Sequence, residues 1–311
     1  MIHVFIINSF AGRSGDITEM IRTELSRKEN FEYLVFNSEY PGHEGVLAGQ
    51  IYDLFPDEVI RFYCCGGSGT VRNIMTGLPD LSRAEIAVYP TGATNDFLAV
   101  FGKKRALFKS MDNLIHGKVV EVDYIRSNAG CALNTLSSGY DVKMVKRLET
   151  LSKLPFGVDR TSYAMAAGIA FFGKSPLHCR VEVDGQFCSD NTADMVIIAN
   201  GRVLGGSFHA GSGNDPSDGL LNVLVVPKIW GFSKLKMLMA FVRGDEDYIV
   251  DHCRTYAARR INLYPVDENG FDGCYDGEII HSTHLEAKVV PRGVKLVIPQ
   301  DINPEEVFHV Q

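Results

Sequence analysis

The sequence lacks an apolar run long enough to cross a bilayer. A membrane-spanning helix needs about 20 consecutive apolar residues, and the longest small-apolar run, residues 164–172, is short and interrupted by glycine. The apolar residues 2–7 are followed at once by polar ones, so we expect no signal peptide. These features predict a cytoplasmic protein that meets a membrane, if at all, peripherally from its surface.

A basic surface is also missing. The chain has 31 Lys and Arg against 38 Asp and Glu, which gives a net charge of -7. Proteins that hold nucleic acid through its phosphates carry a basic patch or stripe, and the sequence contains none. We therefore expect no nucleic-acid partner.

The cysteines lack the paired spacing of a metal site. Their number, seven, is odd, and Cys64, Cys65 and Cys179 fall inside apolar, strand-like segments. Reduced, buried thiols fit this distribution better than a disulfide framework. Internal repeats and low-complexity segments are absent too, so the fold must be inferred from the apolar pattern.

The first part of the chain alternates strand-like runs with amphipathic, helix-like ones. This alternation is typical of a parallel sheet covered by helices, and it predicts a Rossmann-like three-layer α/β domain over residues 1–121. The predicted strands are 2–7, 31–36, 59–65 and 86–89, and the predicted helices are 15–27, 46–54 and 71–78.

Beyond residue 121 strand-like segments dominate. A β-sandwich or barrel-like domain over 122–290 is expected, and the tail 291–311 is expected to return to the first domain. The predicted strands are 121–125, 131–136, 178–183, 195–200, 220–227, 260–264, 277–281 and 285–290, and the predicted helices are 142–151, 163–171 and 232–242.

Three glycine-rich turns follow predicted strands of the first domain: residues 8–15, 66–70 and 90–96. The second leads directly into a predicted helix, so its backbone N–H groups and the positive helix N-terminus are available to an anion. The carboxyl ends of parallel strands share one sheet edge, where open α/β folds bind ligands. Taken singly, each turn has an ordinary alternative, a tight turn whose glycine supplies a positive φ.

Six ordered motifs extend over residues 8 to 278. They are Asn8 with Gly12 and Gly15, Gly66–Thr70, Pro90–Phe97, Leu133–Asp141, Asn200–Gly201 with Gly205–Gly206 and Ser217–Leu221, and Asp276–Glu278. In this order they resemble the catalytic domain of diacylglycerol kinase-type lipid kinases. That superfamily includes bacterial soluble lipid kinases, sphingosine kinases and, more distantly, NAD kinases and phosphofructokinases.

The resemblance implies transfer of the γ-phosphoryl group of ATP to a lipid hydroxyl, with Mg²⁺ as cofactor. It assigns Asp276 as the base that takes the hydroxyl proton and Glu278 as a carboxylate that helps hold the catalytic metal. From the residues alone, the alternative for this pair is a β-turn that reverses a strand. The nucleotide-site residues that it implies are Asn8, Gly12, Arg13, Gly66, Gly67, Ser68, Gly69, Thr70, Thr94 and Asn95.

A second cation is expected in the loop that contains Asp215, Asp218 and Leu220. Closely spaced carboxylates and turned backbone carbonyls suit a hard, oxygen-preferring ion, and relatives are similar in holding a structural Mg²⁺ there. An Asx-type turn that caps a strand is the alternative.

The chain departs from the family at two acidic positions. The usual first signature is Gly-Gly-Asp-Gly-Thr, and Ser68 occupies the acidic position; Asn73 replaces the Glu of the following helix. A serine hydroxyl can ligate Mg²⁺ but brings no charge. Asp96, in the turn 90–96, is the candidate to compensate and the third predicted catalytic residue.

Three functions remain open. The first is an ATP-dependent lipid kinase acting on a diacylglycerol-like lipid at a membrane surface, weakened by Ser68. The second is a catalytically impaired nucleotide- or lipid-binding regulatory relative. The third is a phosphotransferase for a non-lipid alcohol, similar to NAD kinases. ATP and a lipid are the expected partners, and a homodimer is a further option.

Overall fold

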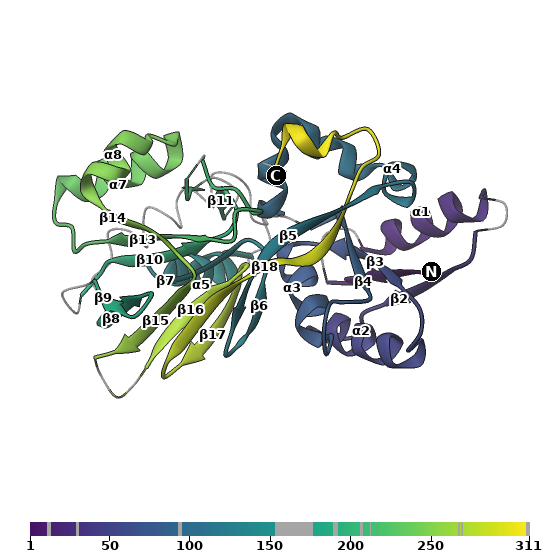
Figure 1. Ribbon diagram of the computed structural model, residues 1–311, viewed down its shortest axis with the longest axis horizontal. Helices are drawn as coiled ribbons and strands as arrows, with labels where there is room; N and C mark the ends of the chain where they lie inside the picture. The colour runs from purple at the N-terminus through teal and green to yellow at the C-terminus, as the bar shows by residue number, and fades with distance from the viewer. Residues whose placement is uncertain are drawn as a thin grey trace. The chain divides into compact units, whose positions relative to one another are not determined.

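The computed structural model describes residues 1–10, 14–28, 31–92, 95–152, 177–188, 192–205, 208–211, 213–266, 268 and 270–308. The chain forms two compact units (Figure 1). Unit 1 consists of Met1–Tyr124, Asp215–Gly219 and Val290–Gln311, and unit 2 of Ile125–Asn214 and Leu220–Val289. Nothing in the sequence signals that the short segment 215–219 belongs with unit 1.

Unit 1 contains a parallel sheet. Its strand order is β2-β1-β3-β4 followed by the C-terminal part of β18, and each neighbouring pair is parallel. All seven residues of β3 are buried, as expected for a central strand whose two faces are both covered. The strands are β1 (Ile2–Ile7), β2 (Tyr33–Asn37), β3 (Ile60–Gly66), β4 (Ala84–Pro90) and β18 (Leu285–Ile298).

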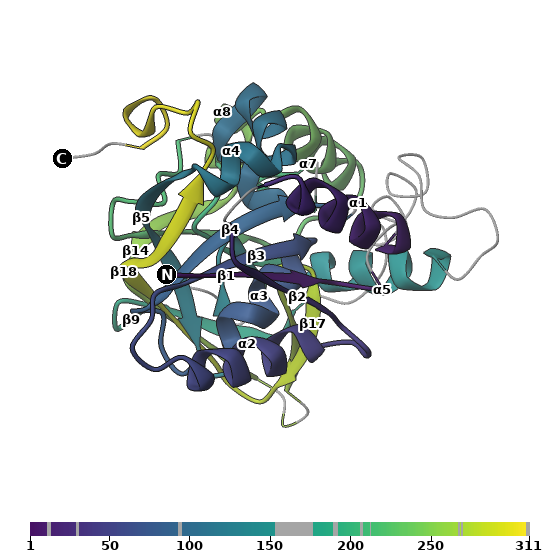
Figure 2. The same ribbon diagram turned by 90° about the vertical axis from the view of Figure 1, so that its right-hand side faces the viewer.

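Helices cover both faces of this sheet. Helices α1 and α4 lie on one side, and α2 and α3 lie on the other (Figure 2). Glycines bring α2 and α3 together, because a Cβ at Gly77 would lie 2.1 Å from the carbonyl oxygen of Gly45. The helices are α1 (Ser14–Ser26), α2 (His43–Leu54), α3 (Ser68–Gly77), η1 (Asp96–Lys109) and α4 (Met111–Ile115). A short turn, η2 (Pro304–Glu306), lies near the C-terminus.

Unit 2 is built on antiparallel strands. One sheet has the order β14-β13-β10-β7-β16-β17, and a second is formed by β9, β8, β15 and the first part of β18. The strands of the first sheet are β7 (Thr135–Gly139), β10 (Met195–Ala199), β13 (Leu221–Val226), β14 (Arg254–Ala258), β16 (Phe271–Tyr275) and β17 (Glu278–Ser282). The others are β6 (Gly130–Ala132), β8 (Cys179–Val183), β9 (Gln186–Phe187), β11 (Val203–Leu204), β12 (Phe208–His209) and β15 (Arg260–Pro265). Strand β5 (Lys118–Ser127) belongs to unit 1 up to Tyr124 and to unit 2 from Ile125.

Strand β10 shows how unit 2 fills two cores. Val196 and Ile198 belong to a cluster formed by residues of both sheets, which is the interior of the sandwich. The alternate residues Met195 and Ile197 face a second cluster, which contains helix residues. This alternation follows from the two-residue period of a strand. The helices of unit 2 are α5 (Tyr140–Ser152), α7 (Phe232–Arg243) and α8 (Glu246–His252).

The predicted architecture, an α/β domain followed by a β-sandwich, is confirmed. The predicted strand 131–136 is divided into β6 and β7, and the strands β14 and β16 and the helix α8 were missed. The predicted helix 163–171 lies outside the described residues.

No helix in the described part of the chain is both long enough and apolar enough to span a bilayer.

The seven cysteines, all of them described, form no disulfide, and six are buried. Burial raises the pKa of the Cys179 thiol to about 12, because an apolar environment disfavours the thiolate. The expected burial is confirmed for these six cysteines, and their reduced state stays a prediction.

His3 gives unit 1 a specific dependence on pH. Its Nδ1 lies 2.9 Å from the hydroxyl of Tyr63, and its ring lies 4.5 Å from that of Phe31. Burial, reinforced by the positive charges of Arg61 and the N-terminus, lowers the pKa of His3 to about 4. The imidazole is therefore neutral in the folded chain at pH 7. At a pH where the unfolded chain binds a proton at His3 and the folded chain does not, the folded state is destabilised.

We predict that stability which His3 contributes fully above pH 6.5 is lost as pH falls towards 4. Between pH 6.5 and 4, the free energy of unfolding of the wild-type chain should fall by about 1–2 kcal/mol more than that of His3→Asn. This value allows for solvent screening of a half-buried group. Urea unfolding at pH 7.5 and 4.5 measures the difference. Parallel changes in the two proteins would contradict the assignment.

Candidate functional site

The two glycine-rich turns of unit 1 are joined directly. The backbone N–H groups of Thr91 and Gly92 donate to the carbonyl oxygen of Gly66, at 3.1 and 3.0 Å. A Cβ at Gly92 would lie 2.5 Å from the Cα of Gly67, which is closer than any real Cβ contact. Glycine is therefore required at position 92 so that the two turns can touch.

Side chains that follow three different strands form hydrogen bonds at the turn 66–70. The Nδ2 of Asn8, after β1, donates to Oγ1 of Thr70 at 2.9 Å. The Nδ2 of Asn95, after β4, donates to the carbonyl oxygen of Gly66 at 3.2 Å. Strands β1, β3 and β4 are parallel neighbours, so the ends that carry the predicted residues lie at one edge of the sheet.

Gly69 differs from Gly66 because the fold does not require a glycine there. A Cβ there would meet no atom of the described residues within 4 Å, and its φ is not in the left-handed region. By contrast, a Cβ at Gly66 would lie 2.1 Å from Oγ1 of Thr70. A helical glycine with open space above it favours close approach of a ligand to the backbone.

Two buried oxygens beside this turn have no hydrogen-bond partner among the residues that the structure describes. They are Oγ1 of Thr91 and Oδ1 of Asn95. An unsatisfied buried acceptor costs about 1–3 kcal/mol, so such atoms usually mark a place for a polar ligand or water. Together with Gly69 they fit a ligand that brings hydrogen-bond donors and phosphates to the turns.

Three predicted residues of this site, Gly12, Arg13 and Thr94, lie outside the described residues.

Asp276 in unit 2 is held by backbone groups. It lies between β16 and β17 with a φ of 48° and is buried. Its carboxylate accepts hydrogen bonds from the N–H groups of Leu133 at 2.7 Å, Thr135 at 2.8 Å and Asn134 at 3.2 Å. Both oxygens are engaged, so the observed contacts tie the β6–β7 connection to this turn. Glu278, two residues later, is exposed.

The predicted cation loop of unit 1 gathers three carboxylates. Oδ1 of Asp215 accepts from the N–H of Ser217 at 3.0 Å. Asp123, in the otherwise apolar part of β5, accepts from the N–H groups of Gly219 and Arg292, each at 2.7 Å.

Electrostatics connect Asp123 with this loop. Burial raises the pKa of the Asp123 carboxyl, and the like charges of Asp218 and Asp215 raise it further. The structure thus brings Asp215 and Asp218 near a third acid that sequence reasoning missed. Leu220, the remaining predicted ligand, is the first residue of the following unit 2 segment. Over the described ranges, no group of three or more His, Cys, Asp or Glu has the geometry of a metal site.

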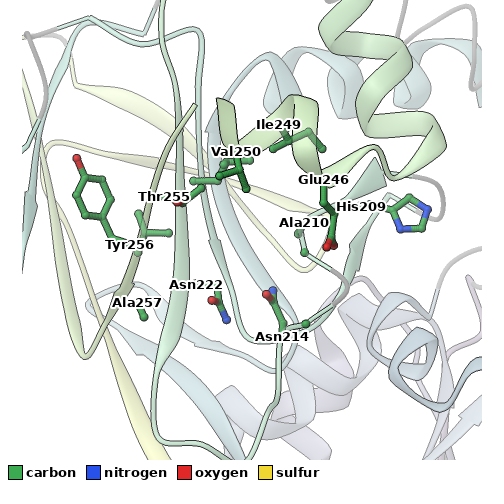
Figure 3. A pocket seen from close by; sticks show the side chains of 14 residues that line it. His209, Ala210, Asn214, Asn222, Glu246, Ile249, Val250, Thr255, Tyr256 and Ala257 are labelled. Atoms are coloured by element: carbon green, nitrogen blue, oxygen red, sulfur yellow. The ribbon is translucent and has the colours of Figure 1, made fainter. Parts of the chain in front are cut away.

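A pocket of about 420 Å³ lies within unit 2 (Figure 3). Asn214, Asn222 and Glu246 line it with polar groups, beside Ile249 and Val250 of α8. Its one carboxylate, and the absence of Lys and Arg from its described lining, suit a neutral ligand rather than a phosphate. Sequence reasoning did not find this pocket, because its residues come from four separate segments.

Two family models match the chain. Residues 3–127 match the diacylglycerol kinase catalytic domain, and residues 134–298 match the YegS C-terminal NAD kinase beta sandwich-like domain. This chain belongs to the diacylglycerol kinase family.

Individual relatives in this family carry lipid kinase names. "Putative lipid kinase YtlR" of Bacillus subtilis (strain 168) is 26% identical over 316 residues, which cover 94% of this chain and 98% of the relative. "Putative lipid kinase SAS0691" of Staphylococcus aureus (strain MSSA476) is 25% identical, with 80% of each chain covered.

Solved structures from Bacillus anthracis str. Sterne share the fold. One described as a "putative diacylglycerol kinase" superposes with a TM-score of 0.70 at 18% identity, covering 98% of this chain and 96% of that one. Another, described as a diacylglycerol kinase, superposes with a TM-score of 0.64 at 20% identity. This superposition covers 98% of this chain and 97% of that one. At these identities the likeness supports the fold alone.

The first departure from the family pattern, Ser68, has a defined place in the structure. Its Oγ accepts a hydrogen bond from the N–H of Asp96 at 3.3 Å. This bond joins the start of α3 to the start of η1. Ser68 therefore helps to fix the one acidic residue that the two turns contain.

The second departure, Asn73, is paired with a carboxylate from another helix. Its Nδ2 donates to Oε2 of Glu44 in α2 at 3.3 Å, and its Oδ1 accepts from Nη1 of Arg72 at 3.0 Å. Glu44 is only 1% exposed. The negative charge that this diacylglycerol kinase family member lacks at Asn73 is thus present next to it, on α2. Sequence reasoning missed Glu44 because a single Glu in a first helical turn is ordinary.

We predict opposite outcomes for two alanine substitutions in the turns. Gly69→Ala should leave the chain as stable or up to about 1 kcal/mol more stable, but weaken ATP binding about 10-fold, the loss of one charge-assisted hydrogen bond. Gly92→Ala should destabilise unit 1 by about 1–3 kcal/mol, because its Cβ meets backbone. Thermal unfolding and calorimetric titration with ATP measure both effects. Unchanged ATP affinity in Gly69→Ala would contradict the phosphate role.

Proposed function

We propose that the protein is an ATP-dependent lipid kinase, which transfers the γ-phosphoryl group of ATP to the hydroxyl of a diacylglycerol-like lipid. The joined turns of unit 1 support this most directly. They combine an open glycine at position 69 with the unsatisfied buried oxygens of Thr91 and Asn95, within the described residues. Membership of the diacylglycerol kinase family supports the class of reaction.

The turns would bind the nucleotide through the backbone. The N-terminus of α3 carries a partial positive charge and presents backbone N–H groups, which favour phosphate oxygens. Its first turn, Ser68–Val71, has no acidic side chain that would repel them. Gly69, where a Cβ would meet no described atom within 4 Å, leaves this backbone open to the phosphates.

Unit 1 would supply one carboxylate to a bound Mg²⁺. The ion is commonly held by one or two carboxylates together with substrate phosphates, and Asp96 is the proposed carboxylate in unit 1. The Ser68 hydroxyl accepts a hydrogen bond from the backbone N–H of this same residue. When bound, the ion would neutralise charge on the transferred phosphoryl group. Asp215, Asp218 and Leu220 stay the proposed residues for a second, structural cation.

In the transfer itself, the lipid oxygen bonds to the γ-phosphorus while the bond to the β–γ bridging oxygen breaks, and ADP leaves. The hydroxyl proton passes to a carboxylate, for which Asp276 is the proposed base, and Glu278 is the proposed metal carboxylate. A cytoplasmic location, a membrane-surface substrate and a homodimer remain part of the proposal.

Two observations favour the second candidate, a nucleotide-binding regulatory relative. Asp276 already accepts three backbone hydrogen bonds, so its oxygens are less available to a substrate hydroxyl. Ser68 is neutral at a position that is usually acidic. The third candidate, an NAD kinase-like phosphotransferase, is less favoured because the relatives reported above are named lipid kinases.

Transfer of label from γ-labelled ATP to a lipid panel tests the proposal. Diacylglycerol, phosphatidylglycerol and sphingosine form the panel. We expect a labelled lipid, and we expect Ser68→Asp to increase the rate about 10- to 100-fold by restoring a metal-associated carboxylate. ATP binding without transfer to any lipid, in both proteins, would support the regulatory relative instead.

Substitution of the two unit 2 carboxylates separates a structural from a catalytic role. Asp276→Asn should lower the free energy of unfolding by about 1–3 kcal/mol, because an amide offers one acceptor oxygen to three backbone donors. Glu278→Gln, at an exposed position, should change it by less than about 0.5 kcal/mol. If both residues act in transfer, both variants lose most of kcat at a temperature where they are folded. A folded Asp276→Asn with full kcat would remove the proposed base.

A further inference from the structure

The loop before α7 exposes two large aromatic side chains. Trp230, the only tryptophan of the chain, is 71% exposed, and Phe232 is 73% exposed. Gly231 between them has a φ of 58°, a left-handed conformation that suits glycine. Exposing two such rings side by side leaves a large apolar area in water, which is typical of an interaction surface.

Helix α7 continues this surface along one face. Its buried face, with Met237, Leu238, Ala240 and Phe241, belongs to the second core cluster of unit 2. On the outer face, Phe232, Lys236, Met239 and Arg243 follow one another at intervals of four, three and four residues, and all four are exposed. Apolar and cationic side chains thus share the outer stripe of an amphipathic helix.

The charge of this region is opposite to that of the chain. Residues 227–244 contain four cationic residues and no Asp or Glu, whereas the whole chain has a net charge of -7. The Nζ of Lys228 lies 4.4 Å from the centre of the Trp230 ring. Lys234 lies over the ring of Tyr140, at 4.7 Å. Cations are therefore held beside the aromatic rings.

Acidic residues lie at the other end of the helix or are buried. Asp245, Glu246 and Asp247 follow the C-terminus of α7, about 18 Å along the helix from Phe232. Asp194 is 2% exposed and accepts a hydrogen bond from the N–H of Ile229. The N-terminal half of the α7 surface is therefore both apolar and cationic.

We infer that this surface, Lys228–Phe232 with the outer stripe of α7, docks the protein on an anionic lipid bilayer. Trp is enriched at membrane interfaces, and helices with Lys and Arg beside an apolar stripe lie in the interfacial plane. A second copy of the chain would bring four like charges against these four, which opposes a symmetric dimer through this face. The inference rests on the proposed function for its biological purpose, access to a lipid substrate.

The single tryptophan provides the test. Vesicles of phosphatidylcholine and phosphatidylglycerol in equal amounts should shift Trp230 emission to shorter wavelength, and pure phosphatidylcholine vesicles should do so far less. In Phe232→Ser/Lys228→Gln/Lys236→Gln, which keeps Trp230, affinity for the mixed vesicles should fall about 10- to 100-fold. Leu54→Ser, at a 70% exposed position of α2, is the matched control and should bind as the wild type does.

Other outcomes overturn the inference. An unshifted emission with mixed vesicles would exclude insertion of Trp230. Equal binding by the triple variant and the control would place docking elsewhere. An emission shift that follows protein concentration without lipid, with a doubled mass in light scattering, would assign the surface to a second copy.

A kinase assay separates this inference from the proposed function. If both hold, the triple variant loses activity on vesicle-embedded diacylglycerol but keeps activity on a water-soluble, short-chain diacylglycerol. If the wild type shows the emission shift but transfers phosphate to neither acceptor, the docking surface stands and the kinase proposal fails. If the triple variant equals the wild type on both acceptors, docking through α7 fails and the kinase proposal stands.

Discussion

The carbonyl oxygen of Gly66 is the atom on which the candidate site depends. It ends β3, and it accepts hydrogen bonds from the N–H groups of Thr91 and Gly92 and from the side chain of Asn95. A single acceptor thus holds two turns that are about 25 residues apart in the sequence. This contact brings the start of α3 against the turn after β4, and the Ser68–Asp96 hydrogen bond joins them a second time.

The same contact places an acidic residue close to Ser68, one of the two positions where the family usually has an acid and this chain does not. Because the turns touch, the hydroxyl of Ser68 reaches the backbone of Asp96, and the neutral residue helps to position the remaining acid. On the other side of α3, Glu44 lies against Asn73. Negative charge is therefore present near both altered positions, but on different segments.

The sequence predicts what depends on local pattern. The glycine turns, the strands of unit 1 and the strand β10 follow from residues close together in the chain. The edge strand β14 and the short helix α8 were missed, since they are brief and their patterns are mixed. Asp123 and Glu44 could not be found, because their significance comes from contacts with segments tens of residues away.

Asp276 shows a different limit of sequence reasoning. Its Asp-Gly-Glu motif predicts a catalytic carboxylate through family resemblance, and its residues alone equally predict a turn. The structure gives it three backbone donors from Leu133, Asn134 and Thr135, contacts that a turn-forming residue would have. A motif identifies the residue type that chemistry needs, whereas its hydrogen bonds decide how available that residue is.

Hydrogen exchange with and without Mg²⁺-ATP tests most directly whether the joined turns are a nucleotide site. Backbone amides that donate hydrogen bonds to the bound phosphates should be protected from exchange, and the segments that contain these amides should be stabilised. We predict slower exchange in residues 66–72 and 90–97, with no comparable change in β14 or α8. Unchanged exchange in both turns at saturating nucleotide, or protection confined to unit 2, would contradict the account.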